Sequence, residues 1–398
     1  MIRLAHVSDL HIDERGRLDD VVAVLRAFLH QAEEAEVDLI LVAGDCFERR
    51  STPRERAALA DFLQAAALIA PVFGVKGNHD QAGDLSLFNR LEARRMVYFA
   101  ELPLGAVPGS AFLWPLKGER FVGLQALPWF DKAHLVSQLE ASVDAEASRL
   151  MTIEAARAML TAYRAEAQRL KHDGVVPIFV SHTMVGGSEV STGQTIIGTT
   201  VELAPSDLLD IGAAYVALGH VHKTQEWFDG RVAYSGSPHR CNFGEPEAKG
   251  WRLVTLEDDG SFVSNEFREL PARRMVLLEK DWTDSVGQGD DAIATHAELD
   301  SMKGALVRWR VHINAQDLAH LDENLVERFL HGAGAAEVQI EAVVEHEARA
   351  RAPEIVEAKS TLEKVRAFFD AKGIEVGVEQ AARLQQKLAT LEGSSAAS

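Results

Sequence analysis

The chain of 398 residues is longer than one typical domain, so two or three domains are expected. Its 41 Lys and Arg residues against 60 Asp and Glu residues give a formal net charge of −19, which excludes binding to nucleic acid or acidic membranes through overall charge. The two cysteines are too few for a disulfide framework and fit a reducing cytoplasm. No stretch approaches the roughly 20 apolar residues of a membrane span, so we expect a soluble cytoplasmic protein without membrane contact.

Strand and helix patterns alternate over the first part of the chain. The near-continuous apolar run VDLILVA is typical of a strand that is buried on both faces. Pro53 opens a segment with helical periodicity, because proline suits the first turn of a helix. The expected elements are strand 2–8, helix 18–35, strand 37–43, helix 53–70 and strand 71–75. This order predicts a layered α/β domain.

The elements expected further along divide the chain into three parts. Hairpin-like pieces near 96–127 precede a helix at 144–172 and strands at 175–181, 213–218 and 231–235. A compact βαβαβ unit follows, with strand 275–281, helix 288–302, strand 304–313, helix 317–332 and strand 336–345. Helical patterns at 353–371 and 378–392 carry little apolar surface of their own and indicate docking on another surface, or else an unpacked acidic terminus. The predicted domains are 1–272, 273–346 and 347–398.

Residues that can bind a metal ion follow five of the predicted strands. They are Asp9 and His11 in DLH, Asp45 in GD, Asn78 with His79 and Asp80 in GNHD, His182 in SH, and His220 and His222 in GHVH. The carboxyl ends of strands are where ligands gather in open α/β sheets. We therefore expect these side chains to converge on one site. Taken singly, an aspartate such as Asp45 is more often a turn or helix cap, and only the ordered set is hard to obtain by chance.

The chemistry of the set favours a pair of divalent ions. Imidazole, carboxylate and amide ligands suit Mn²⁺, Fe²⁺ or Zn²⁺, and no thiolate is needed, so Cys46 is interpreted as a packing residue. Seven candidate ligands are too many for one tetrahedral site, but they supply two adjacent sites if one carboxylate is shared. Two-metal sites activate water and clamp the attacking and leaving oxygens of a displacement at phosphorus. The ten other histidines, His6 among them, lack such a context and are interpreted as packing or surface residues.

The ordered motifs DLH, GD, GNHD, SH and GHVH resemble those of the calcineurin-like metallophosphoesterase superfamily over residues 1–240. The stretches RLAHVSDLHID and GSPHRCNFGEPEAKGW, with the appended domain and tail, look like the SbcD-type DNA repair nucleases. The resemblance implies a layered β-sandwich flanked by helices, a small capping domain and a C-terminal helical segment. It also implies a nuclease with 3′-5′ exonuclease and single-strand endonuclease activity.

The resemblance also implies roles for individual residues. One metal ion would be held by Asp9, His11, Asp45 and His222, and the other by Asp45, Asn78, His182 and His220, so that Asp45 bridges the pair. The most expected ion is Mn²⁺, with Mg²⁺, Fe²⁺ and Zn²⁺ as alternatives. His79 would contact the scissile phosphate and assist departure of the 3′ oxygen, and Asp80 would hold the imidazole of His79 in its useful tautomer.

One departure from the family pattern concerns a residue that would position the DNA strand. Some relatives carry a second functional histidine after the loop of the bridging aspartate, whereas this chain has Glu48. Arg49, Arg50, Arg54 and Arg56 follow at once, and they fit phosphate contacts and a solvated helix end equally well. Arg240, near a predicted active-site loop, has the same two interpretations. The set expected to contact nucleic acid is Arg49, Arg50 and Arg240.

Three functions are compatible with these features. The first is a DNA nuclease subunit that works with an SbcC-type coiled-coil ATPase, which would bind residues 353–392. That assembly would be two-plus-two around a nuclease homodimer, for which a helix near 84–95 is the candidate surface. The second is a phosphodiesterase or phosphatase that acts on small nucleotides or phosphoproteins. The third, a scaffold between an ATPase and DNA, predicts missing ligands, and none of the seven is missing.

Overall fold

The computed structural model of the chain describes most of the first 345 residues and a few positions beyond. The described residues are 1–15, 17–116, 120–129, 145–191, 194, 202–284, 286–287, 289–345, 363–365, 368–369, 372 and 383. The predicted helices at 353–371 and 378–392 therefore lie almost wholly outside the described residues. Among the described residues, no helix is both long and apolar enough to cross a membrane.

Two six-stranded sheets form the centre of the molecule. The first has the order β12 (Phe262–Glu269), β11 (Gly250–Leu256), β1 (Ile2–Val7), β2 (Leu39–Val42), β3 (Val72–Val75) and β4 (Val97–Ala100). The second has the order β5 (Phe112–Pro115), β6 (Phe121–Leu127), β7 (Val176–His182), β8 (Tyr215–Gly219), β10 (Val232–Tyr234) and β9 (Gln225–Trp227). Strands β1, β2, β3 and β4 run parallel, as do β6, β7 and β8. Their carboxyl ends therefore share one edge in each sheet.

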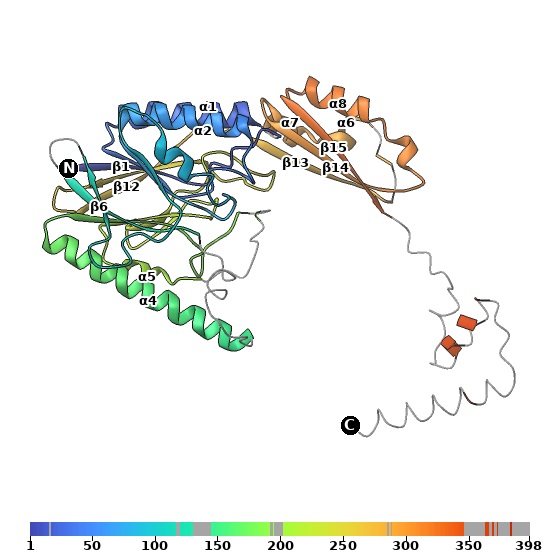
Figure 1. Ribbon diagram of the computed structural model, residues 1–398. Helices are drawn as coiled ribbons and strands as arrows, with labels where there is room; N and C mark the ends of the chain where they lie inside the picture. The colour runs from blue at the N-terminus through green and yellow to red at the C-terminus, as the bar shows by residue number, and fades with distance from the viewer. Residues whose placement is uncertain are drawn as a thin grey trace. The chain divides into compact units, whose positions relative to one another are not determined.

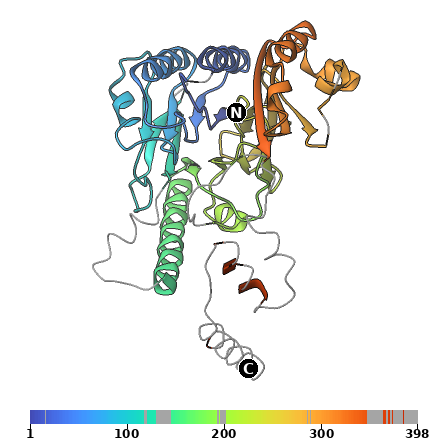
Figure 2. The same cartoon turned by 90° about the vertical axis from the view of Figure 1, so that its right-hand side faces the viewer.

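Helices cover the outer face of each sheet. Figure 1 places α1 (Leu18–Glu34) and α2 (Pro53–Ile69) on one side of the pair of sheets, and α4 (Ala145–His172) and α5 (Pro205–Leu209) on the other. Figure 2 shows the same separation from the side, with α4 in green away from the blue helices. The result is the layered α/β sandwich that the sequence predicts.

The alternating directions of the side chains along each strand explain why the first sheet is covered on both faces. Leu4 and Leu41 face the second sheet and pack in a buried cluster with Ile178 and other residues of that sheet. Their neighbours Ala5 and Ile40 point the other way, into a core formed with α1 and α2. Successive side chains of a strand point to opposite faces, so a strand apolar at every position must be covered on both sides. This is why the run VDLILVA lies in the middle of the first sheet.

A third sheet has the order β13 (Met275–Trp282), β14 (Leu306–Asn314) and β15 (Glu337–Glu345). The short helices of this region are α6 (Asp290–Ile293), α7 (His296–Met302), the 3₁₀ helix η2 (Leu318–His320) and α8 (Glu323–Gly332). The chain divides into two compact units, Met1–Leu278 with Ile293–Trp309 and Asn324–Ile340, and Glu279–Ala292 with Arg310–Glu323 and Glu341–Ser398. The domain borders expected at residues 272 and 346 stay a prediction.

Several predicted elements differ from the structure. The helix expected at 288–302 is interrupted, because Thr295 forms a capping box with Glu298 and starts α7 anew. The helix expected near 84–95 is the short 3₁₀ helix η1 (Ser86–Arg90). Among the described residues between 96 and 127, only β5 and β6 form a hairpin, since β4 pairs in parallel with β3. Strands β9, β11 and β12 were not predicted, and the last two extend the first sheet beside β1.

Candidate metal centre

The seven predicted ligands come together where five strands end. Strands β1, β2 and β3 are neighbours in the first sheet, and β7 and β8 are neighbours in the second. The loops after β1 and β2 are joined by backbone hydrogen bonds, from Asp9 N to the Gly44 carbonyl and from His11 N to the Asp45 carbonyl, both 3.0 Å. His182 ends β7, and His220 directly follows β8. The edge shared by the parallel strands thus collects the motifs.

The backbone at this edge adopts an uncommon conformation. Four of the predicted ligands have a positive φ: Asp9 at 54°, His11 at 40°, Asp45 at 50° and His220 at 111°. Each such residue costs on the order of 1–3 kcal/mol and persists where the surrounding structure holds it, commonly at functional sites. Four of the seven described residues with positive φ outside glycine are thus predicted ligands, and the other three are Glu36, Phe228 and Asp229.

Asp45 lies between two groups of candidate ligands. One group contains Asp9, His11 and Asp45, and the other contains Asp45, His182 and His220, with the ligand atoms of each group within 4.8 Å of one another. The Oδ2 atom of Asp45 lies 3.2 Å from His182 Nε2 and 3.9 Å from His11 Nε2. One carboxylate oxygen thus faces a histidine of each group, which is the arrangement that a bridging ligand requires.

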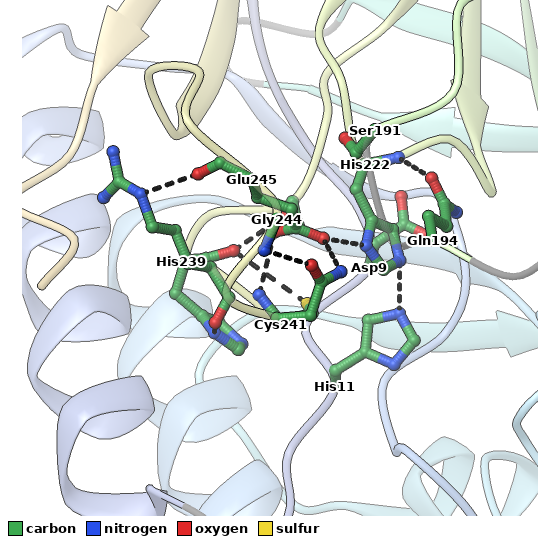
Figure 3. A network of polar contacts seen from close by, with 12 residues as sticks. Asp9, His11, Ser191, Gln194, His222, His239, Cys241, Gly244 and Glu245 are labelled. Carbon is green, nitrogen blue, oxygen red and sulfur yellow. Dashed lines mark hydrogen bonds and ion pairs between the residues drawn. The ribbon is translucent and has the colours of Figure 1, made fainter. Parts of the chain in front are cut away.

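The remaining predicted ligands complete the two groups. Asn78 Oδ1 lies 2.9 Å from both His182 Nε2 and His220 Nδ1. His222 Nε2 faces His11 Nε2 at 3.0 Å (Figure 3). Two ring nitrogens that each lie roughly 2.0–2.1 Å from one cation are separated by about this distance.

The buried cluster also contains an unsatisfied ring nitrogen. Among the described residues, nothing accepts from or donates to the buried His220 Nε2. An unpaired buried polar atom is unfavourable in a folded protein, and a bound ion is one way to satisfy it. The donor set of nitrogens and oxygens therefore fits two adjacent divalent cations, and their coordination by these residues is a prediction.

The charges around Asp45 favour the ionised form of its carboxylate. Burial alone would raise its pKa, but the neighbouring histidines, His182 first, outweigh burial and hold the pKa of Asp45 far below its usual range. Burial lowers the pKa of His220 to about 4, and the nearby His182 adds to the shift. A neutral imidazole and an ionised carboxylate are the forms that bind metal ions.

Two glycines allow the close approach of the loops. A Cβ atom on Gly77 would lie 2.1 Å from Asp45 Oδ1, and one on Gly219 would lie 1.9 Å from the Ala43 carbonyl oxygen. No side chain fits at either position. Gly219 belongs to the second sheet and Ala43 follows a strand of the first, so this contact brings the two halves of the centre together.

The structure corrects the expected role of Asp80. Its carboxylate accepts hydrogen bonds from the backbone N–H groups of Gly77 at 2.9 Å and Phe47 at 3.0 Å, and it is buried. It therefore braces two loops rather than the His79 ring. The Nδ1 atom of His79 lies 2.7 Å from the backbone carbonyl oxygen of Glu48. Because a carbonyl only accepts, Nδ1 carries the proton and Nε2 is left for another partner.

Glu48, the departure from the family pattern, also contacts a predicted ligand. Its Oε2 atom lies 2.7 Å from His11 Nδ1. Burial lowers the pKa of His11, but the neighbouring Cys241 first, then the contact with Glu48 and the charge of Asp45, outweigh this effect and raise the pKa. The carboxylate thus occupies the side of His11 that faces away from His222, where it orients the ring.

The arginines expected to contact nucleic acid have different surroundings. Arg49 forms an ion pair with Asp13 and lines a cavity of about 290 Å³ beside His11. Arg50 is exposed. Arg240 is half-buried and donates to the carbonyl oxygens of Glu245 at 3.0 Å, Ala272 at 3.1 Å and Glu247 at 3.2 Å. These contacts favour a structural role for Arg240.

Several residues of the centre were not among the predicted site residues. Gln194 joins the two histidines of GHVH, donating to the His220 carbonyl at 2.6 Å and accepting from the His222 backbone N–H at 3.1 Å. Glu245 accepts from His222 Nδ1 at 2.8 Å. Cys241 lies within 4.8 Å of the ligand atoms of His11 and His222. Cys241 and Glu245 lie in the stretch GSPHRCNFGEPEAKGW, but neither that stretch nor the sequence around Gln194 indicates which residues contact the histidines, so only the folded chain reveals these contacts.

The family model of the calcineurin-like phosphoesterases matches residues 2–224. This match covers more than half of the chain, and it includes all seven predicted ligands. The chain therefore belongs to the calcineurin-like phosphoesterase family, a class of metal-dependent hydrolases of phosphoester bonds whose members typically bind two divalent metal ions.

Three solved structures are similar at low identity. The protein TT1561 of Thermus thermophilus is 14% identical over 67% of this chain and 98% of that chain, with a TM-score of 0.38. GAP50 of Plasmodium, described as the anchor in the inner membrane complex, is 12% identical over 69% and 90%, with a TM-score of 0.39. A dimetal phosphatase of Danio rerio is 13% identical over 67% and 96%, with a TM-score of 0.39.

Proposed function

We propose that this phosphoesterase is the nuclease subunit of an SbcD-type complex and hydrolyses phosphodiester bonds of DNA. The observation that carries the proposal is the pair of ligand groups joined at Asp45 in a member of the phosphoesterase family. The stretch at 236–251 and the elements that follow the sandwich support the subfamily. The substrate class and the cytoplasmic setting are part of the proposal.

A local reversal of charge supports a polyanionic substrate. The cavity of about 290 Å³ beside His11 is lined by Arg17, Arg49 and Arg308 as well as by Glu48 and Asp13. The three guanidinium groups outnumber the two carboxylates at this opening, so the local charge is slightly positive in a chain whose net charge is −19. Arginine is well suited to phosphate, because its planar donors can bind two oxygens at once. Bound cations would add to this charge.

Two divalent cations, most simply Mn²⁺, would supply the Lewis acidity that activates water and stabilises negative charge on phosphate. Mg²⁺, Fe²⁺ and Zn²⁺ are the alternatives. Asp9, His11 and His222 would hold one ion, Asn78, His182 and His220 the other, and Asp45 both. The remaining chemistry belongs to the chain itself.

His79 is the proposed acid. Its ring centroid lies 5.0 Å from that of His11, and its side chain is 25% exposed, so the ring borders the centre and is open to a substrate. The Glu48 carbonyl fixes the proton on Nδ1. A protonated Nε2 would donate to a phosphate oxygen and then release its proton to the departing 3′ oxygen.

A direct assay separates this function from the second candidate, a phosphodiesterase or phosphatase of small substrates. Linear duplex DNA and a small aryl phosphodiester are offered to the full chain with Mn²⁺. Hydrolysis of the duplex, abolished by chelation, is expected. Turnover of the small diester alone would refute the nuclease proposal and favour the second function.

The proposed partner is an SbcC-type coiled-coil ATPase that binds residues 353–392, in a two-plus-two assembly around a nuclease homodimer. The ATPase would hold duplex DNA, so the nuclease subunit could act on DNA despite its own negative net charge. Deletion of residues 347–398 is expected to leave a folded, metal-binding protein that no longer co-purifies with the ATPase. Retained co-purification would place the docking surface elsewhere.

A further inference from the structure

We propose that Glu245 is a positioning residue for the first metal ion, acting on it through His222. Glu245 lies in the loop between β10 and β11, and its side chain has no exposed surface. Its Oε1 atom accepts a hydrogen bond from His222 Nδ1 at 2.8 Å (Figure 3). The inference rests on the proposed metal centre and adds a residue that would control one ion without touching it.

Four donors fix the orientation of the Glu245 carboxylate. Oε1 accepts from His222 Nδ1 at 2.8 Å and Asn242 Nδ2 at 2.9 Å. Oε2 accepts from the Cys241 backbone N–H at 2.9 Å and lies 2.8 Å from Lys249 Nζ. Both oxygens are therefore occupied by the protein, and the carboxylate meets His222 at the nitrogen opposite His11. This placement makes Glu245 an orienting group and not a ligand.

The contact selects one tautomer of His222. An ionised carboxylate only accepts hydrogen bonds, so Nδ1 must carry a proton. In the neutral ring, the lone pair is then on Nε2, which faces His11 Nε2 at 3.0 Å. A carboxylate behind a ligating histidine also raises the basicity of that histidine, and loss of such a partner typically weakens metal binding about 10–100-fold.

Lys249 forms a buried ion pair with the carboxylate of Glu245. Its side chain is buried, and its Nζ also lies 2.9 Å from Glu247 Oε1 and 3.0 Å from Ser237 Oγ. An unpaired buried charge would be strongly unfavourable, so the ammonium group is needed where it stands. The ion pair with Lys249 therefore holds the carboxylate of Glu245 where it meets His222 Nδ1.

The test compares metal binding by the full chain and its Glu245→Gln variant, which keeps the shape of the side chain and removes its charge. We expect Mn²⁺ affinity at the position of His11 and His222 to fall about 10–100-fold, with the other position unchanged. Elemental analysis at a Mn²⁺ concentration that just fills both positions of the wild type should then give one ion per chain instead of two. Electron paramagnetic resonance should show an isolated Mn²⁺ ion in place of a coupled pair.

Glu247→Gln is the matched control. The carboxylate of Glu247 contacts Lys249 at 2.9 Å and Ser191 at 2.6 Å, and neither is a predicted metal ligand. This variant should therefore keep the coupled pair of Mn²⁺ ions. If Glu245→Gln does not fold, Glu245→Asp retains the charge and withdraws it by one methylene, and the same selective loss is expected.

Two outcomes would overturn the inference, namely unchanged affinity at both positions or equal losses at both. A wild-type protein that binds no pair of ions would instead refute the proposed centre. The two failures are therefore distinguishable in the same measurement.

Discussion

Replacement of Gly77 by alanine tests whether Asp45 has to stay where the structure places it. The backbone of Gly77 does not have a positive φ, so alanine is free of backbone strain and only its methyl group matters. That methyl group would lie 2.1 Å from Asp45 Oδ1 and 2.3 Å from Asp45 N. Ordinary van der Waals contact begins at 3.4 Å, so one partner must retreat by about 1.3 Å.

The size of the effect follows from this displacement. Overpacking of a buried site typically costs about 1–3 kcal/mol, which should lower the stability of the metal-free protein by that amount. A shift of about 1 Å in a catalytic group can cost on the order of 10²-fold in rate. Because Asp45 serves both proposed ions, affinity at both positions should fall, unlike the selective loss expected for Glu245→Gln.

The assay combines urea unfolding of the metal-free protein with elemental analysis after incubation with Mn²⁺. Gly332→Ala is the control, because a Cβ atom there meets nothing within 4 Å at the end of α8. The control should bind two ions and stay within about 1 kcal/mol of the wild type. A Gly77→Ala protein with wild-type stability and two tightly bound ions would refute the reasoning.

Two further predictions concern histidines. His79→Ala should retain both ions by elemental analysis yet lose about 10²–10⁴-fold in turnover, and loss of an ion would instead make His79 a ligand. Burial, aided by the charge of Arg252, lowers the pKa of His6 from 6.5 to about 3. Between these values only the unfolded chain gains a proton, so the free energy of unfolding decreases as pH falls. His6→Gln should reduce that slope by up to about 1.4 kcal/mol per pH unit in urea titrations, and an unchanged slope would contradict the assignment.

Local patterns were enough to predict the layers and the edge where the ligands meet. The strand around Leu41 is apolar at every position, and such a strand must be covered on both faces wherever it occurs. Asp45 and Asn78 follow parallel strands closely, so the position of each along the chain nearly fixes its position in space. The positions of strands β11 and β12 could not be predicted in this way, because β11 pairs with β1 from about 250 residues away and β12 pairs with β11.

Contacts between distant segments had no signature along the chain. Asp80 follows His79 directly, yet its carboxylate turns to Gly77 and Phe47, and the Glu48 carbonyl takes the place beside the His79 ring. Consecutive residues of a loop can thus direct their side chains to different partners. His6 likewise belongs to a strand face, and only the second sheet supplies its partner Tyr215, 2.7 Å away.

The sequence by itself determined which chemical groups stand at the strand ends, because the type of residue and its distance from an apolar run are local properties. Only the tertiary structure decided which side chains orient those groups. Glu245 and His222 are separated by 23 residues, and their 2.8 Å contact depends on how the loop after β8 packs against the loop between β10 and β11. Hydrogen bonds act over a few ångströms, so their partners are chosen by the packing of the whole sandwich.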